Sequence, residues 1–442
     1  MALSSEELAQ LLASLALIMV SAHVFGQLFT RLRQPRVIGE IVGGLVLGPT
    51  LLLRLFPGTL GWVFPTSGPI PAVLGAVYQL GLLLLMYCSG TEMRSLFGRG
   101  DRKTVVAITV GGILVPFLAG LLLVSVIGTG SLQGAGANHG AFVLVFGIAI
   151  AVTSIPVISK ILFDLGIIGT SFARVVLAAA VVEDVVLYVA LAVALGLAQT
   201  SHVGLFGVPA LLHLAPDSAA NVVYHVLAEV GFLVLALVGG PRLFRWTLTF
   251  RYNLLMRSNA IAFELAFMLV LSVACVVLGV IPLFGAFVAG IIAGTSSTES
   301  AIQAREGIKR FSFAFFVPIY FALVGLQLDL VRAFDVRFFV AFLVFATTVK
   351  AGSVYASARL AGETHAAGVN LAIAMNARGG PGIVLASVAF DARIVSRSFF
   401  TCLVMLAVVT SMFAGAWLER VVRRGSPLRG AGKAEVITDS LR

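Results

Sequence analysis

Charged side chains are scarce in this chain, making up 11% of its 442 residues, whereas 59% are hydrophobic. Soluble domains carry about 25% charged residues, so the composition excludes a soluble globular protein and indicates one that crosses a membrane several times. The net charge of +10 comes from short clusters of Lys and Arg between apolar segments. Nucleic-acid binding would call for a basic stripe with interleaved aromatic residues. The sequence has none, so we expect no nucleic-acid partner.

Cysteine is rarer still. Cys88, Cys275 and Cys402 lie in apolar segments, and none of them has the C-x-x-C spacing of a metal or redox motif. We therefore predict that all three are inert core residues. We also expect no cofactor and no enzymatic activity.

Long apolar runs, by contrast, are frequent. A membrane-spanning helix needs roughly 20 apolar residues, and the runs predict an all-α polytopic membrane protein with a short tail at 422–442. Placing the N-terminus outside the cell membrane leaves 23 basic residues on the cytoplasmic side and 5 outside. The positive-inside rule favours this orientation, with a cytoplasmic C-terminus. The thirteen predicted helices cover residues 8–29, 37–54, 71–91, 104–127, 141–163, 174–198, 222–240, 260–280, 282–297, 311–328, 338–358, 367–389 and 398–421.

Two adjacent carboxylates, Glu183 and Asp184, interrupt the apolar run at 175–195. One ionised carboxylate at mid-bilayer costs about 2.5–3.5 kcal/mol even on lenient insertion scales. The pair is therefore expected to face protein, water or a bound cation. The other 28 basic residues fall in the connections, in the tail or near helix ends, so only Lys350 and Arg378 lie well inside predicted helices. These four charges point to ion or proton transport.

The fifth predicted helix, 141–163, carries an interruption. Thr153, Ser154 and Pro156 place hydroxyl groups and a proline in its interior. Proline removes a backbone donor and clashes with the preceding turn, which frees carbonyl groups that could coordinate a cation. The sequence therefore predicts a broken helix at this point.

The twelfth predicted helix, 367–389, is interrupted at Gly379, Gly380 and Pro381. Each break lies in the middle helix of a three-helix group, and the two groups have opposite predicted orientations. Transporters often build their site where two such helices break near mid-membrane in inverted repeats. We expect the two breaks to cross, with the acid pair and the buried lysine beside them.

These motifs resemble the monovalent cation:proton antiporter-2 family, which includes Kef-type potassium efflux systems, bacterial sodium/proton antiporters and plant cation/proton exchangers. The resemblance covers roughly residues 30–420. Single motifs are moderately specific, whereas their order along the chain is highly specific. The matching segments are 34–50, 80–85, 89–92, 153–162, 178–185 and 316–329, together with Lys350, Arg378 and Gly379.

The resemblance implies a sodium/proton antiporter-like fold and an elevator-like mechanism. It places core helices within 104–198 and 338–421, the dimerisation side of a homodimer within 8–91 and 260–328, and a linker helix at 222–240. Kef-type members carry a nucleotide-binding domain in a long tail. The short tail here leads us to expect no nucleotide-binding regulatory domain.

The resemblance also assigns roles to the polar residues. Asp184 matches the family's cation- and proton-exchanging aspartate, so the hypothesis is that it holds either a proton or a Na⁺ or K⁺ ion. Burial of a carboxylate favours the proton, and a nearby cation competes with it. Thr153, Ser154 and freed backbone carbonyls of the broken helix are expected to complete an oxygen shell.

Glu183 departs from the family, which has aspartate, asparagine or glutamine at this position. It could pair with Lys350 and be released when the cation binds, or it could carry a second proton. A structural salt bridge that only fixes helix packing is a third interpretation.

Other charges in the predicted helices are expected to play supporting parts. Arg378 is expected to orient the crossing rather than to touch the ion. Glu40 and Glu264 lie near predicted helix ends, where snorkelling to water is the default. Two other functions stay open at this point: a gated potassium efflux channel-like protein and a proton-coupled organic solute transporter.

Overall fold

The structure, a computed structural model, describes residues 3–32, 34–92, 102–135, 137–199, 207–212, 219–250 and 253–429. Within these ranges the regular structure is helical, with one isolated bridge between Gln133 and Val395. Ten of the described helical segments are long and apolar enough to cross a membrane. The predicted all-α polytopic class is confirmed, and the number of thirteen spans stays a prediction.

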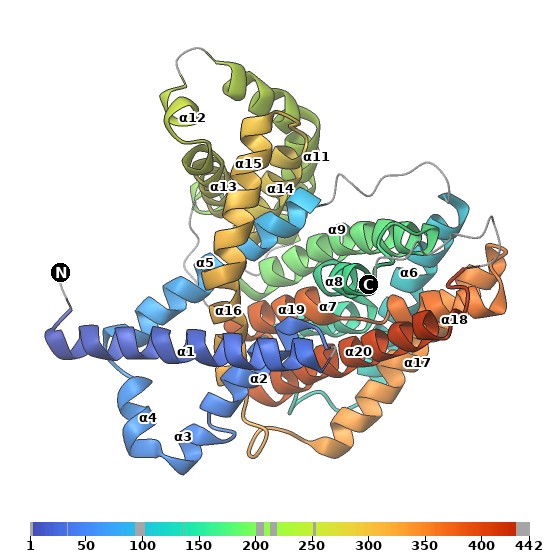
Figure 1. Ribbon diagram of the computed structural model, residues 1–442, viewed down its shortest axis with the longest axis horizontal. Coiled ribbons are helices and arrows are strands. Elements are labelled where there is room, and N and C mark those ends of the chain that lie inside the picture. Colours follow the sequence, from blue (N-terminus) through green and yellow to red (C-terminus); the bar gives the residue numbers. More distant parts are fainter. Residues whose placement is uncertain are drawn as a thin grey trace.

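One set of helices, here called the scaffold group, occupies the left and top of Figure 1. Its members are α1 (Ser5–Arg31), α2 (Arg36–Leu47), α5 (Pro69–Glu92), α13 (Ala260–Val277), α14 (Pro282–Gly294), α15 (Glu299–Phe311) and α16 (Val317–Leu326). In this group α2 packs against both α1 and α16, while α14 packs against both α5 and α13. The short helix α3 (Leu52–Leu55) falls at the end of the predicted helix 37–54, whereas α4 (Pro57–Val63), α10 (Val208–Leu211) and α12 (Leu254–Ser258) were not expected from hydropathy.

A second set, here called the core group, lies to the right in Figure 1. Its members are α6 (Arg102–Val126), α7 (His139–Ala151), α8 (Ile155–Asp164), α9 (Ser171–Gln199), α17 (Val336–Leu360), α18 (His365–Ala374), α19 (Gly379–Asp391) and α20 (Arg397–Arg423). The pairs α7/α8 and α18/α19 are the two predicted broken helices, each between two continuous ones. The predicted interruptions are therefore confirmed.

Helix α11 (Ala219–Thr249) contacts both α9 of the core group and α14 of the scaffold group. It occupies the place of the predicted linker helix 222–240, although it extends further at both ends. The division of labour between a moving core and a dimerisation side stays a prediction.

Hydropathy misplaced the start of one helix by a wide margin. The predicted helix 311–328 in fact begins at Glu299, because α15 runs into α16 through a π-helical turn at Ser312–Phe316. The first turns carry Arg305 and other charges on one face, so they form an amphipathic helix that a search for apolar runs passes over.

Glycines allow scaffold helices to touch backbone to backbone. A Cβ atom at Gly44 of α2 would lie 1.8 Å from the carbonyl oxygen of Ala322 in α16. One at Gly290 of α14 would lie 2.1 Å from the carbonyl oxygen of Tyr87 in α5. Such close approach suits membranes, where helix association depends on packing because lipid supplies no hydrophobic driving force.

The tail predicted at 422–442 is docked where it begins. The Arg429 guanidinium donates to both carboxylate oxygens of Glu363, with Nε 3.0 Å from each. Thr104 of α6 donates to the same carboxylate at 2.8 Å, and Asn370 donates to the carbonyl oxygen of Leu428 at 3.1 Å. The remainder of the tail, 430–442, lies outside the described residues.

Candidate functional site

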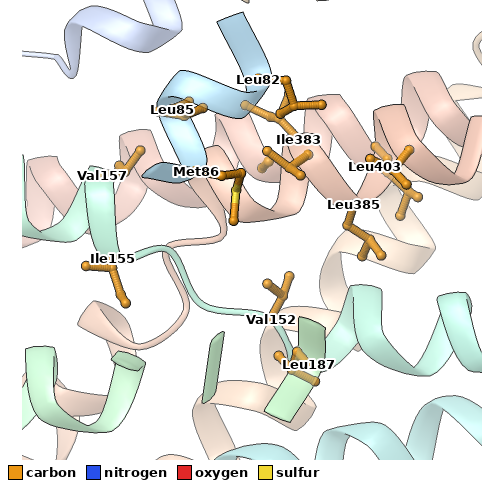
Figure 2. Packing of buried hydrophobic residues seen from close by; sticks show 14 of the residues in the cluster. Leu82, Leu85, Met86, Val152, Ile155, Val157, Leu187, Ile383, Leu385 and Leu403 are labelled. Atoms are coloured by element: carbon orange, nitrogen blue, oxygen red, sulfur yellow. The ribbon is translucent and has the colours of Figure 1, made fainter. Parts of the chain in front are cut away.

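The site predicted from the sequence lies where the two broken helices cross. Figure 2 shows Val152 at the start of the extended segment between α7 and α8, and Ile155 where α8 begins. Ile383 of α19 and Met86 of α5 point toward the same region. The crossing is therefore enclosed by apolar side chains from both helix groups.

Hydrogen bonds join the two breaks directly. The backbone N–H of Ser154 donates to the carbonyl oxygen of Ala377 at 2.7 Å, and the hydroxyl of Thr153 donates to that of Met375 at 2.6 Å. Thr153 and Ser154 are fully buried. Buried backbone groups must be paired somewhere, and each break here satisfies groups that the other leaves free.

The two predicted helix-breaking prolines both lie in the first turn of a half-helix. Pro156 is the second residue of α8 and Pro381 the third residue of α19. In the first helical turn a missing N–H loses no intrahelical bond. Each proline therefore begins the second half of its helix rather than bending a continuous one.

Glycine is required at the start of α19. Gly379 has a φ of +25°, and a Cβ atom there would lie 2.3 Å from Cγ2 of Val157. The next residue, Gly380, donates its N–H to the Ser154 hydroxyl oxygen at 3.1 Å. That oxygen also accepts the N–H of Val157 at 3.3 Å.

Ser154 is therefore poorly suited to the ligand role predicted for it. Its oxygen already accepts two backbone N–H groups, one from the first turn of α8 and one from that of α19. Helix N-termini carry partial positive charge and favour anions. The hydrogen bonds of Ser154 make it a connector between the two half-helices.

Arg378 closes the C-terminal end of α7. Its guanidinium donates to the carbonyl oxygens of Ala149 at 3.3 Å, Ile150 at 3.1 Å and Ala346 at 2.9 Å. It also donates to Oδ1 of Asn376 at 2.7 Å. A cation at a helix C-terminus satisfies orphan carbonyls and complements the dipole. This geometry agrees with the expectation that Arg378 orients the crossing.

Lys350 is held by three acceptors in the core. Its ammonium group lies 2.6 Å from the carbonyl oxygen of Ala151, 2.8 Å from that of Gly112, and 2.8 Å from Oε2 of Glu183. The side chains of Lys350 and Glu183 are both fully buried. Three donors therefore meet three acceptors, one of them charged.

The Gly112 contact has a cause in the sequence that motif reasoning missed. Pro116 lies inside α6, and a proline leaves the carbonyl of the residue four positions earlier without its helical donor. Lys350 binds that free carbonyl. A proline inside the predicted helix 104–127 was the available signal.

The acid pair divides its work. Glu183 bonds to Lys350 through Oε2, whereas Asp184 is 2% exposed and its Oδ1 has no hydrogen-bond partner among the described residues. Adjacent helical residues point about 100° apart. One carboxylate is therefore balanced by a lysine, and the other remains available to a proton or a cation.

The expected shell of freed carbonyls needs correction. The last three carbonyl groups of α7, at Ala149, Ile150 and Ala151, already accept hydrogen bonds from Arg378 and Lys350. The side chains of Lys350 and Arg378 thus bind the carbonyl oxygens that the sequence analysis had assigned to a transported cation. Thr153 donates its hydroxyl proton to a carbonyl, so its oxygen keeps free lone pairs and can still serve as a ligand.

Snorkelling was the wrong expectation for two acids of the scaffold group. Glu40 is 3% exposed and accepts from Arg36 at 3.0 Å. Glu264 is 1% exposed and accepts from the Tyr87 hydroxyl at 2.5 Å, with Arg305 at 3.7 Å. Neither lies at the crossing, so the expectation that they are not ligands there is unaffected.

Comparison with known proteins identifies the family. The family described as "Sodium/hydrogen exchanger, transmembrane" matches residues 16–424. The chain belongs to this family. The match spans both helix groups and both broken helices, so the resemblance inferred from motifs is confirmed.

Several curated members of this sodium/hydrogen exchanger family align along nearly the whole chain. K(+)/H(+) antiporter 1 of Saccharomyces cerevisiae is 30% identical over 98% of this chain, which spans 48% of that protein. The Na(+)/H(+)-K(+) antiporter GerN of Bacillus cereus is 26% identical over 92% of this chain and 94% of its own length. This chain therefore spans about half of the yeast relative and aligns with most of GerN.

A solved structure shares the fold. The sodium proton antiporter MjNhaP1 from Methanocaldococcus jannaschii superposes with a TM-score of 0.57 over 95% of this chain and 99% of that one, at 14% identity. The predicted sodium/proton antiporter-like fold is confirmed at the level of helix arrangement.

Proposed function

We propose that this protein exchanges protons for a monovalent cation, Na⁺ or K⁺, across the membrane, with Asp184 binding the two in turn. The observation that carries the proposal is the contrast within the acid pair. Each acid has one buried oxygen without a hydrogen-bond partner among the described residues, Oε1 of Glu183 and Oδ1 of Asp184, but only Glu183 has a salt bridge there, to Lys350. The relatives named as K⁺/H⁺ and Na⁺/H⁺-K⁺ antiporters support the choice of ions.

Burial of Asp184 supplies a physical reason for coupling. An ionised carboxylate in an apolar interior is costly unless it is neutralised by a proton or paired with a cation. A site loaded with either ion avoids this cost, while an empty site does not. Movement of the empty site across the membrane is therefore disfavoured. The site crosses in one direction with a proton bound and returns with the metal cation bound, so the two fluxes are coupled.

We infer that the core group moves against the scaffold group in an elevator-like manner. A cavity between the groups has an almost wholly apolar lining. It includes Met86 and Phe284 on the scaffold side and Leu191, Val384 and Val388 on the core side. Apolar surfaces can slide without breaking ion pairs or hydrogen bonds.

We further infer that the scaffold group forms a homodimer contact and that the N-terminus lies outside the cell membrane. Native mass spectrometry in detergent checks the dimer. For orientation, cysteines replacing Gly58 and Ser426 are labelled with an impermeant reagent in intact cells. The three native cysteines are buried, so background labelling is low. We expect labelling at 58 and none at 426, and the reverse pattern would invert the topology.

Transport is tested in proteoliposomes that contain a pH-sensitive dye. We expect addition of Na⁺ or K⁺ to release protons with the wild-type protein and to have no effect with Asp184→Asn. Glu306→Gln is the matched control, because Glu306 is exposed and pairs with Arg310 of its own helix, away from the crossing. Cation-driven proton release that survives in Asp184→Asn would contradict the assigned role. A series of Li⁺, Na⁺, K⁺ and Rb⁺ gives the selectivity.

The same vesicles separate exchange from the other two functions. An antiporter accumulates the cation against its gradient when a proton gradient is imposed, whereas a passive channel cannot. Absence of accumulation with rapid equilibration would favour the channel. Proton movement that depends on an organic solute and not on inorganic cations would favour a solute transporter.

A further inference from the structure

A second group of oxygen-bearing side chains lies away from the crossing, at the end of α19. A pocket of about 360 Å³ opens there between α5, α16 and α19. Its polar lining is formed by Tyr78, Gln79, Gln327 and Asp391. Carboxylate, amide and hydroxyl oxygens are the ligands that hard cations prefer.

The acidic member of this pocket has no counter-charge. Asp391 is exposed, and its carboxylate has no salt-bridge partner in the part of the chain that the structure describes. It faces the hydroxyl of Tyr78. A lone carboxylate in a concave, partly apolar pocket concentrates cations from the adjoining solution.

Two buried hydroxyls next to the pocket, those of Tyr320 and Ser387, are neighbours of each other but share no hydrogen bond of ordinary geometry. Tyr320 is 0% exposed and Ser387 is 1% exposed, and neither hydroxyl oxygen makes a hydrogen bond of ordinary geometry with any described residue. A buried polar group left unsatisfied costs about 1–3 kcal/mol. Unpartnered hydroxyls beside a polar pocket are therefore positions where a water molecule or a passing ion supplies the missing partner.

Tyr320 connects the pocket to the interior. Its ring centroid lies 5.0 Å from that of Tyr78. Its hydroxyl is an electrostatic neighbour of Tyr78, Ser387 and Asp391 on the pocket side, and of Tyr188 on the inner side. Ser387 stands one helical turn before Asp391 on α19, so both side chains share one face of that helix.

Tyr188 completes the connection to the exchange site. It lies one helical turn after Asp184 on α9 and interacts electrostatically with it. Beside Tyr188 is a small cavity of about 10 Å³, whose other lining residues are apolar. Polar oxygens thus lead from the pocket to Asp184 through a constriction between the core and scaffold groups.

We propose that Asp391, with the hydroxyls of Tyr78, Tyr320 and Ser387, forms a second monovalent-cation site through which the exchanged cation reaches and leaves Asp184 on this face of the membrane. The inference rests on the proposed antiport at Asp184. The ligands come from both helix groups: Tyr78 and Tyr320 from the scaffold, Ser387 and Asp391 from the core. Relative movement of the groups therefore assembles or disperses this site.

Side-specific transport tests the proposal. The cation concentration for half-maximal exchange is measured in right-side-out and in everted vesicles. Asp391→Asn is expected to raise it about tenfold in the one vesicle type that presents the pocket to the added cation. The maximal rate is expected to stay unchanged. No change in either type, or an equal change in both, would overturn the proposal.

Two further variants sharpen this test. Asp329→Asn removes a charge from the same face, but its Oδ1 only caps the N–H groups of Val331 and Arg332, a task that asparagine performs equally well. This control is expected to behave as wild type. Tyr320→Phe keeps the ring and removes only the unpartnered hydroxyl. If the hydroxyl is merely buried, the cation concentration for half-maximal exchange should not change. If it belongs to the proposed site, that concentration should rise, and only in the vesicle type that presents the pocket to the added cation.

A binding measurement separates failure of this inference from failure of the proposed function. In Asp184→Asn the exchange site is removed, and the second site remains. We expect Na⁺ or K⁺, compared with choline at equal ionic strength, still to raise the melting temperature of this variant in detergent. The rise should vanish in Asp184→Asn/Asp391→Asn. Absence of any rise in Asp184→Asn would overturn the second site, whereas a wild-type protein without cation-driven proton release would overturn the proposed function.

Discussion

The carboxylate of Glu183 lies 2.8 Å from the ammonium group of Lys350, with both side chains fully buried. Asp184, the next residue of the same helix, has no partner for Oδ1 among the described residues. One helix turn therefore carries an acid paired with a lysine and an acid without a salt bridge among the described residues, and the two are expected to respond differently to substitution.

Removing the charge of Glu183 is expected to destabilise the protein. Glu183→Gln leaves the Lys350 ammonium without its counter-charge in the core, and breaking a buried pair costs about 3–5 kcal/mol. The melting temperature in detergent should fall well below that of Glu306→Gln. Glu183→Gln/Lys350→Met, which removes both charges, should recover part of the loss. A single variant as stable as the Glu306→Gln control would show that the pair contributes little.

Removing the charge of Asp184 is expected to have the opposite effect. Its carboxylate has no salt bridge among the described residues, and an ionised carboxylate of this kind is costly to bury, so Asp184→Asn should be at least as stable as wild type in cation-free buffer. Exchange should nevertheless be lost. A strong fall in melting temperature would mean that Asp184 has a structural partner in the folded protein.

Glu183 packs closely against Gly112, and a substitution at Gly112 tests this contact. A Cβ atom there would lie 2.7 Å from Oε1 of Glu183 and 3.1 Å from Cγ2 of Val354. Gly112→Ala is expected to displace the carboxylate from Lys350, lowering both stability and the exchange rate. Gly352→Ala is the control, because a Cβ atom at Gly352 meets nothing within 4 Å. It should gain up to about 1 kcal/mol from helix propensity. Equal behaviour of the two variants would contradict the contact.

The docked start of the tail is expected to depend on pH. Burial acts to raise the pKa of Glu363, but hydrogen bonds from Arg429 and Thr104 and the charge of Arg429 together hold it below the usual 4.5. A carboxyl with a lowered folded pKa contributes stability above its unfolded pKa and loses it as pH falls through the folded value. The melting-temperature difference between wild type and Glu363→Gln should hold down to about pH 5 and shrink below about pH 4. A difference that is lost already at neutral pH would contradict the contact.

Much of the architecture was accessible to sequence reasoning. The two breaks were predicted from Thr153, Ser154 and Pro156 and from the Gly379–Pro381 stretch, and the structure confirms both. The predicted helix boundaries were wrong where a helix begins with charged rather than apolar residues. Helix α15 begins at Glu299 with charged turns, and a search for apolar runs does not detect such turns. Glu264 was misjudged because its partners, Tyr87 and Arg305, come from distant helices.

The sequence by itself determined that the chain crosses a membrane, that two helices break, and that an acid pair lies deep inside. These follow from local properties: the length of apolar runs, the missing N–H of proline, and the cost of burying charge. Only the tertiary structure decided which acid Lys350 balances, that the freed carbonyls of α7 are bound by Lys350 and Arg378, and that Ser154 connects two helix N-termini. Those outcomes depend on atoms brought together from residues far apart in the chain, and no local pattern specifies such a meeting.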